Sequence, residues 1–179
     1  MTPLDASSQP TVTLVLLPAP VMVAMLEGDL PQASSRLGVE LPSFFLTQDW
    51  LWRFRLNQLT SEPTSDPWLV RAVIAQPEDI VVGHAGFHGP PDDRGMVEIG
   101  YSILPEFRRR GYGRAAAREL IHYAAAVPDV RVIRASISPD NVASLALVST
   151  LGFLQVGQQW DEEDGLELIF ERSPRNGEG

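Results

Sequence analysis

A loop rich in arginine and glycine, residues 108–114, constrains this chain more than any other segment. It reads Arg-Arg-Arg-Gly-Tyr-Gly-Arg and lies between an alternating apolar run, residues 97–104, and an alanine-rich run, residues 115–126. The alternation predicts a strand and the alanine-rich run predicts a helix. Backbone amides at a helix N-terminus have no partner inside the helix, and the helix dipole favours negative charge there. The segment therefore predicts an anion site where a strand and a loop lead into a helix.

The residue types in this loop indicate a large, multiply charged anion such as a pyrophosphate or a phosphorylated nucleotide. Gly111 and Gly113 lack a Cβ, so a ligand can come close to the backbone. Arginine side chains can add charge-assisted hydrogen bonds to phosphate oxygens. Five arginines crowd this point of an otherwise acidic chain: Arg108, Arg109, Arg110, Arg114 and Arg118.

Composition excludes several functional classes. The 179 residues are 44% hydrophobic, which suits one domain, and we assign it to residues 11–172 with flexible tails at 1–10 and 173–179. A net charge of −9 argues against nucleic acid as a partner. The absence of cysteine removes disulfides and thiolate metal sites, and we expect no metal. The N-terminal residues show no signal peptide or membrane span, so we expect a cytoplasmic protein without a membrane partner. An oligomer is compatible with the sequence.

Hydrophobic periodicity predicts an α/β fold with a mixed sheet and helices on its faces. The expected strands are 11–17, 68–76, 80–88, 96–104, 130–137, 153–160 and 166–171. The expected helices are 20–30, a second one capped by Thr47 and ending near Pro63, one after Gly113, and one from Asn141 to Leu151. The element order is therefore β-α-α-β-β-β-α-β-α-β-β.

Two separated segments resemble the GNAT superfamily of acyl-CoA-dependent N-acyltransferases. Residues 98–103 run into Arg-Arg-Arg-Gly-Tyr-Gly, which is similar to the Arg/Gln-x-x-Gly-x-Gly/Ala loop that follows a central strand in the family. Residues 141–144, Asn-Val-Ala-Ser, precede Leu-Gly-Phe at 151–153, which is similar to the family's Asn…Gly-Phe segment. The bacterial branch that modifies protein N-termini or small amines looks closest. The resemblance implies a splayed sheet of six to seven strands with about four helices.

The resemblance also implies a function, an N-acetyltransferase that moves an acetyl group from acetyl-CoA to a primary amine by direct attack in a ternary complex. The central strand would part from its parallel neighbour, residues 132–136, and the pantetheine arm would enter the gap. A backbone N–H between Ser102 and Leu104 would polarise the thioester carbonyl. Asn141 would face the cofactor or would simply cap its helix. The implied cofactor-binding residues are Ser102, Ile103, Arg108, Arg109, Arg110, Gly111, Tyr112, Gly113, Arg114, Asn141 and Ser144.

Glu98 is the candidate general base, at a position that resembles the glutamate of histone acetyltransferases in this superfamily. The alternative is a charged residue at the start of a strand. Many relatives carry a tyrosine acid four residues before the glycine of Gly-Phe, and this position is Val148 here. Many N-terminal acetyltransferases carry a second glutamate five residues before the asparagine, and this position is Ser136. The acceptor stays open among a protein N-terminus, a polyamine, an amino acid, an antibiotic and another small amine.

Two alternative functions remain. The fold could bind acyl-CoA as a sensor without catalysis, because the usual acid and second base are missing from their places. A dinucleotide-binding domain is the other alternative, since Gly111-x-Gly113-x-x-Ala116 matches that fingerprint. The fingerprint requires a strand that leads directly into the first glycine, whereas residues 105–110 intervene here. Outside this loop, His84 and His88 share one strand face, where they could border the acceptor or lie partly exposed.

Overall fold

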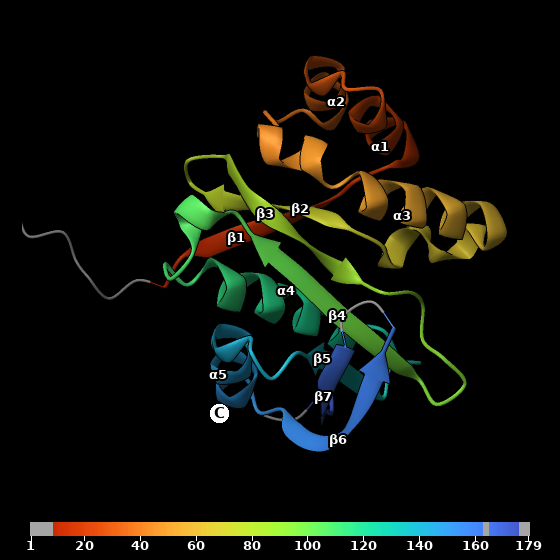
Figure 1. Cartoon of the computed structure of the whole chain (residues 1–179), viewed down its shortest axis with the longest axis vertical. Coiled ribbons are helices and arrows are strands. Elements are labelled where there is room, and N and C mark those ends of the chain that lie inside the picture. Colours follow the sequence, from red (N-terminus) through yellow and green to blue (C-terminus); the bar gives the residue numbers. More distant parts are fainter. Residues whose placement is uncertain (1–8, 163–164, 176–179) are drawn as a thin grey trace, which may run out of the picture.

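The computed structural model describes residues 9–162 and 165–175. Most of the two predicted tails and part of the acidic turn at 161–164 lie outside these residues. Within the described residues the chain forms one sheet of seven strands and five α-helices (Figure 1). None of these helices is both long enough and apolar enough to span a bilayer.

The seven predicted strands are all present in the described part of the chain. Their order across the sheet is β1-β2-β3-β4-β5-β7-β6, and only the central pair, β4 and β5, is parallel. Their bounds are β1 Thr11–Leu16, β2 Arg71–Gln76, β3 Ile80–Phe87, β4 Met96–Ile103, β5 Val132–Ile137, β6 Leu154–Asp161 and β7 Gly165–Arg172. The mixed α/β class is confirmed.

Helices cover both faces of the sheet (Figure 1). One face carries α1 (Ala19–Leu26), α2 (Leu30–Leu37) and α3 (Asp49–Ser61), and the other carries α4 (Tyr112–Ala126) and α5 (Val142–Thr150). Strand alternation gives each side its own core: Ala72 and Ile74 of β2 face Trp52 of α3, whereas Val73 faces Leu120 of α4. The two faces of β4 are therefore directed to two different groups of helices.

Two helical predictions need correction. The segment after the first helix forms a further helix, α2, which begins where Asp29 accepts from the Gln32 amide and ends at Gly38 in the left-handed conformation. The prediction of about four helices missed it because Pro31 and two serines make a poor helix former. Thr47 does not cap α3, since its hydroxyl donates to the Phe44 carbonyl within a 3₁₀ turn, Ser43–Thr47.

The two central strands separate partway along their length. β4 and β5 pair only at Met96 with Val132, Val97 with Ile133, and Glu98 with Arg134. Beyond Glu98, β4 stays paired with β3 up to Ile103, whereas β5 turns to β7. This leaves the β5-facing edge of β4 open from residue 99 to residue 103.

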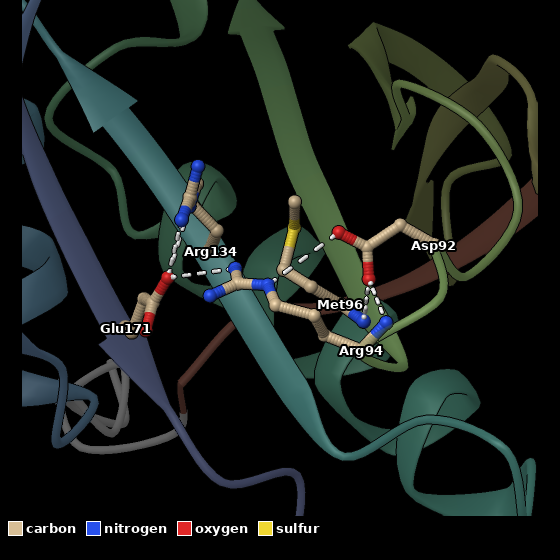
Figure 2. Close-up of polar contacts among 5 residues, drawn as sticks. All are labelled: Asp92, Arg94, Met96, Arg134 and Glu171. Carbon is tan, nitrogen blue, oxygen red and sulfur yellow. Dashed lines mark hydrogen bonds and ion pairs between the residues drawn. The ribbon is translucent and has the colours of Figure 1, made fainter.

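A polar cluster holds the closed end of this split together (Figure 2). Glu171 of β7 accepts from Arg134 of β5 at 2.6 and 3.0 Å, and lies 3.7 Å from Arg94, in the loop before β4. Asp92 in turn accepts from the backbone amides of Arg94 and Met96, both at 2.9 Å. Glu171 therefore links β5, β7 and the loop that leads into β4.

Candidate functional site

The loop between β4 and α4 presents a row of backbone amides. Arg109 and Gly111 both have positive φ, 59° and 87°, with an ordinary residue between them. Alternating backbone conformations of this kind turn successive N–H groups towards one point, which makes an anion-binding concavity. Ala115 is the first residue of this region whose amide bonds within the helix, to the Gly111 carbonyl. Among the described residues, the amides of 109–114 have no acceptor. They are therefore free of partners within the described chain, and the anion site at this loop stays a prediction.

The arginines of this loop do not all face one ligand. Arg108 donates through Nε to the Ile103 carbonyl at 2.9 Å and so fixes the loop to the end of β4. The Arg110 guanidinium lies over the Phe107 ring, and Arg118 bonds to Gln9. Arg114 keeps a buried Nε without a hydrogen-bond partner in the described chain. The side chains therefore shape the loop, and its amides form the regular part of the anion site.

Successive backbone amides of β4 point to opposite edges of the strand, and this alternation identifies the donors that have no strand partner. Leu104 donates to the Val82 carbonyl and His88 donates to the Glu98 carbonyl, so the even-numbered residues of β4 bond to β3. The amide of Ser102 points the same way. The amides of Tyr101 and Ile103 point to the opposite edge, where β5 has already left. Of the candidates between Ser102 and Leu104, Ile103 is the one whose amide faces the split.

The start of α5 lies across from β4 on the α4 side. Asn141 caps α5 by accepting from the Ser144 amide at 3.1 Å, so its side chain is engaged within the helix. The Tyr101 hydroxyl donates to Ser144 Oγ at 3.1 Å. Burial raises the pKa of Tyr101, and the bond to Ser144 offsets this only in part. The phenol is therefore protonated at neutral pH and can donate a proton.

Glu98 occupies the other face of β4, at the closed end of the split. Its side chain is 18% exposed, and one carboxylate oxygen lies 3.8 Å from Nδ1 of His88, whose side chain is 55% exposed. The His88 ring rests on Gly100, where a Cβ would lie 3.1 Å from Nε2. Glycine at 100 therefore leaves room for the imidazole next to the carboxylate.

Two further ionisable side chains adjoin this face. Arg55 of α3 is 8% exposed and donates to the His88 carbonyl at 3.1 Å and to Gln58. Burial lowers the pKa of Arg55 to about 10, so it stays charged at neutral pH. His84 lies opposite Ser102 in the β3–β4 register, and burial together with the charge of Arg55 lowers its pKa to about 4. His84 is therefore neutral at pH 7, with a buried Nε2 on a side chain of intermediate exposure.

The positions of the two missing family residues are also defined. Val148 is fully buried in the core beneath α5, so the residue at the usual tyrosine position packs rather than reacts. Ser136 of β5 has a buried Oγ without a hydrogen-bond partner in the described chain, on the same face as Arg134. In the described residues no group of three or more acidic, histidine or cysteine side chains could hold a metal ion.

A split central pair of parallel strands beside an amide-lined loop defines the class of α/β proteins that hold an elongated, phosphate-bearing ligand in an opened sheet. Residues 40–154 match the acetyltransferase (GNAT) domain family, and the chain belongs to this family. The dinucleotide-binding alternative is wrong, because a 3₁₀ turn, Pro105–Phe107, separates β4 from the glycines.

Known relatives agree with this assignment. The chain is 36% identical over 89 residues to the uncharacterized N-acetyltransferase YjdG of Bacillus subtilis (strain 168), a match that covers 50% of this chain and 51% of that protein. The match thus spans about half the length of this curated relative.

Solved structures share the fold at low sequence identity. The ribosomal-protein-S5-alanine acetyltransferase from Vibrio fischeri has a TM-score of 0.62 at 16% identity, covering 96% of this chain and 97% of that one. The aminoglycoside acetyltransferase AAC(6')-Ib, solved in complex with coenzyme A, has a TM-score of 0.60 at 18% identity, covering 91% and 95%.

Sequence reasoning missed two residues of the site, Tyr101 and Arg55. Tyr101 lies at an odd-numbered, apolar position of the alternating run 97–104, and the signal was that a tyrosine in a core needs a partner for its hydroxyl. Arg55 follows Trp52 at helical spacing, so it shares the buried stripe of α3, and an arginine in such a stripe is the signal that could have identified it.

Proposed function

We propose that the protein transfers an acetyl group from acetyl-CoA to a primary amine. One observation carries the proposal: β4 and β5 part beyond Glu98 and Arg134, beside a loop whose amides at 109–114 have no acceptor in the described chain. The opened edge can take an extended pantetheine arm by strand-like hydrogen bonds, and the loop amides can take a pyrophosphate. Family membership supports the same reaction.

The residues present fit the cofactor. The amides of 109–114 would hold the pyrophosphate, and Arg109, Arg110 and Arg114 are placed on this loop to add charge. The backbone of Tyr101 and Ile103 would hold the pantetheine arm. Acetyl-CoA supplies a thioester, which is an activated acyl group that a neutral amine can attack.

Glu98 is the proposed general base. An amine must lose a proton to become the amide product, and the Glu98 carboxylate lies on the helix α3 side of the split at its closed end. His88, 3.8 Å away, orients the carboxylate. At the open edge of the same strand, the Ile103 amide would donate to the carbonyl oxygen as charge develops there. One strand would thus supply a proton acceptor on its α3-side face and an oxyanion donor at its edge.

Tyr101 is the proposed proton donor to the departing thiolate. Its hydroxyl lies between β4 and the start of α5, and its raised pKa keeps it protonated. This assignment accounts for the absence of a tyrosine at 148, because the acid would come from the strand instead of the helix.

Release of free thiol from acetyl-CoA in the presence of a panel of primary amines tests the proposal. The panel contains amino acids, peptides with free N-termini, spermidine and an aminoglycoside. We expect thiol release that depends on both protein and amine. The second candidate, a non-catalytic acyl-CoA sensor, is favoured by the buried Val148. It predicts acetyl-CoA binding without thiol release for any amine.

A further inference from the structure

Arg55 is a buried cation without a carboxylate partner. Its side chain is 8% exposed, and none of the ion pairs among the described residues includes it. Nη1 donates to Gln58 Oε1 at 2.9 Å and to the His88 carbonyl at 3.1 Å. Nε is buried with no acceptor in the described chain, and Nη2 has none there either. Buried arginines are normally paired, so this fork lacks the anion that its geometry suits.

The unpaired guanidinium is connected directly to the proposed catalytic base. The carbonyl that Arg55 binds belongs to His88, and the ring of the same residue lies 3.8 Å from the Glu98 carboxylate and close to Gly100. Gln58 binds the same carbonyl at 2.8 Å, which fixes α3 to the end of β3. His88 therefore connects Arg55 to Glu98, and both side chains lie on the face of β4 that points away from α4.

The surroundings of Arg55 continue this face along β3. His84 shares the strand face of His88, and its buried Nε2 has no hydrogen-bond partner in the described chain. Its ring stacks on Phe44 at 6.2 Å and meets Phe45 and Trp52 edge-on. This face of the sheet, on the α3 side, thus brings together three features. They are the neutral His84 imidazole, the guanidinium of Arg55, and the aromatic rings of Phe44, Phe45 and Trp52.

We propose that the acceptor amine carries a carboxylate, and that Arg55 binds this carboxylate while Glu98 takes the proton of the amine. The proposal rests on the proposed acetyltransferase function and names its substrate class: small amino acids rather than polyamines or aminoglycosides. A carboxylate matches the planar fork of arginine with two parallel hydrogen bonds. A polycation would place a second positive charge against Arg55 in a desolvated region, which is unfavourable.

Paired acceptors that differ only in the carboxylate test this proposal. The probes are L-amino acids, the corresponding amino-acid carboxamides, and spermidine, with thiol release from acetyl-CoA as the readout. The variants are Arg55→Gln and Arg55→Lys, with Arg53→Gln as a control because Arg53 is exposed on the same helix. Calorimetry with acetyl-CoA on every variant checks that the fold and the cofactor site are intact.

We expect the best amino acid to exceed its carboxamide in kcat/KM by roughly tenfold to a hundredfold, the range for hydrogen bonds to a charged group. Arg55→Gln should raise KM for the amino acid and leave the carboxamide unchanged, Arg55→Lys should lie in between, and Arg53→Gln should behave as the parent. The proposal is overturned if the carboxamide or spermidine matches the amino acid, or if Arg55→Gln slows both acceptors equally.

A binding measurement separates this proposal from the proposed function. If acetyl-CoA binds but no acceptor is acetylated, calorimetry with N-acetyl amino acids and their carboxamides tests whether Arg55 binds a carboxylate. Binding that needs both the carboxylate and Arg55 supports the anion site, and its absence overturns it. If acetyl-CoA does not bind at all, the acetyltransferase function fails, and the same titration still decides whether Arg55 binds a carboxylate.

Discussion

Glu98 on β4 and Arg134 on β5 are the last residue pair that the two central parallel strands share. Arg134 belongs to the polar cluster that keeps the strands together (Figure 2), and the split opens immediately beyond Glu98. The proposed base therefore stands where the sheet changes from closed to open.

Glu98→Gln should lower kcat by about a hundredfold or more, the usual contribution of a positioned base, with acetyl-CoA affinity unchanged. The amide keeps the shape of the side chain and cannot accept the proton at neutral pH. Steady-state thiol release and calorimetry measure the two effects. Glu78→Gln, in the exposed turn before β3, is the matched control and should have parental kinetics. Unchanged turnover in Glu98→Gln would remove this residue from the role of base.

Tyr101→Phe should lower kcat by roughly tenfold to a hundredfold and keep the affinity for acetyl-CoA, because it removes the proton donor and leaves the ring in place. Tyr123→Phe is the control. Tyr123 lies near the C-terminal end of α4, and its hydroxyl donates to the Pro67 carbonyl, away from β4. A loss of cofactor affinity equal to the loss in kcat would assign Tyr101 to binding instead.

Glu171→Ala should destabilise the fold by about 1–3 kcal/mol, because it leaves the Arg134 guanidinium without its charged partner in a site where both side chains are 20% exposed. Urea unfolding gives the change as a lower midpoint at a constant slope. Glu167→Ala, on the same strand and hydrogen-bonded to Gln159, should cost less than about 0.5 kcal/mol. Equal midpoints for the two variants would show that the polar cluster does not hold the closed end.

Stability should fall as pH falls from 6.5 to about 4, in part through His84. Burial and Arg55 lower the pKa of His84 from 6.5 to about 4 in the folded state. In this window His84 binds a proton in the unfolded chain but not in the folded protein. The free energy of unfolding therefore becomes smaller as the pH is lowered, by at most about 3 kcal/mol. The free energy of unfolding, measured at pH 7, 5.5 and 4.5, should fall less steeply for His84→Gln than for the parent. Parallel curves would show that His84 takes up its proton normally.

The strands could be predicted from the sequence because their apolar residues alternate, and the same period of two puts Glu98 and Ser102 on one face of β4. Periodicity does not show where two strands separate, so the split came from the family resemblance. The helix α2 was missed because its cap and its left-handed glycine outweigh a weak intrinsic propensity.

The contacts of Arg55 and Tyr101 could not be predicted from the sequence because their partners are distant in the chain. Arg55 meets the carbonyl of His88, and Tyr101 meets Ser144. Each contact is made by packing of a helix onto the sheet, which local patterns do not encode. The candidate anion loop could be predicted from the sequence because its backbone amides lie within seven consecutive residues, 108–114.

Calorimetric titration with acetyl-CoA tests the central claim most directly, on the parent protein, Gly111→Val and Gly38→Val. Both glycines have positive φ, 87° and 82°, so valine strains both backbones, but only Gly111 belongs to the amide-lined loop. The account predicts one saturable site per chain in the parent and in Gly38→Val, and at least about tenfold weaker binding in Gly111→Val, the equivalent of one strained backbone residue. No heat with the parent, or equal affinity in all three proteins, would contradict it.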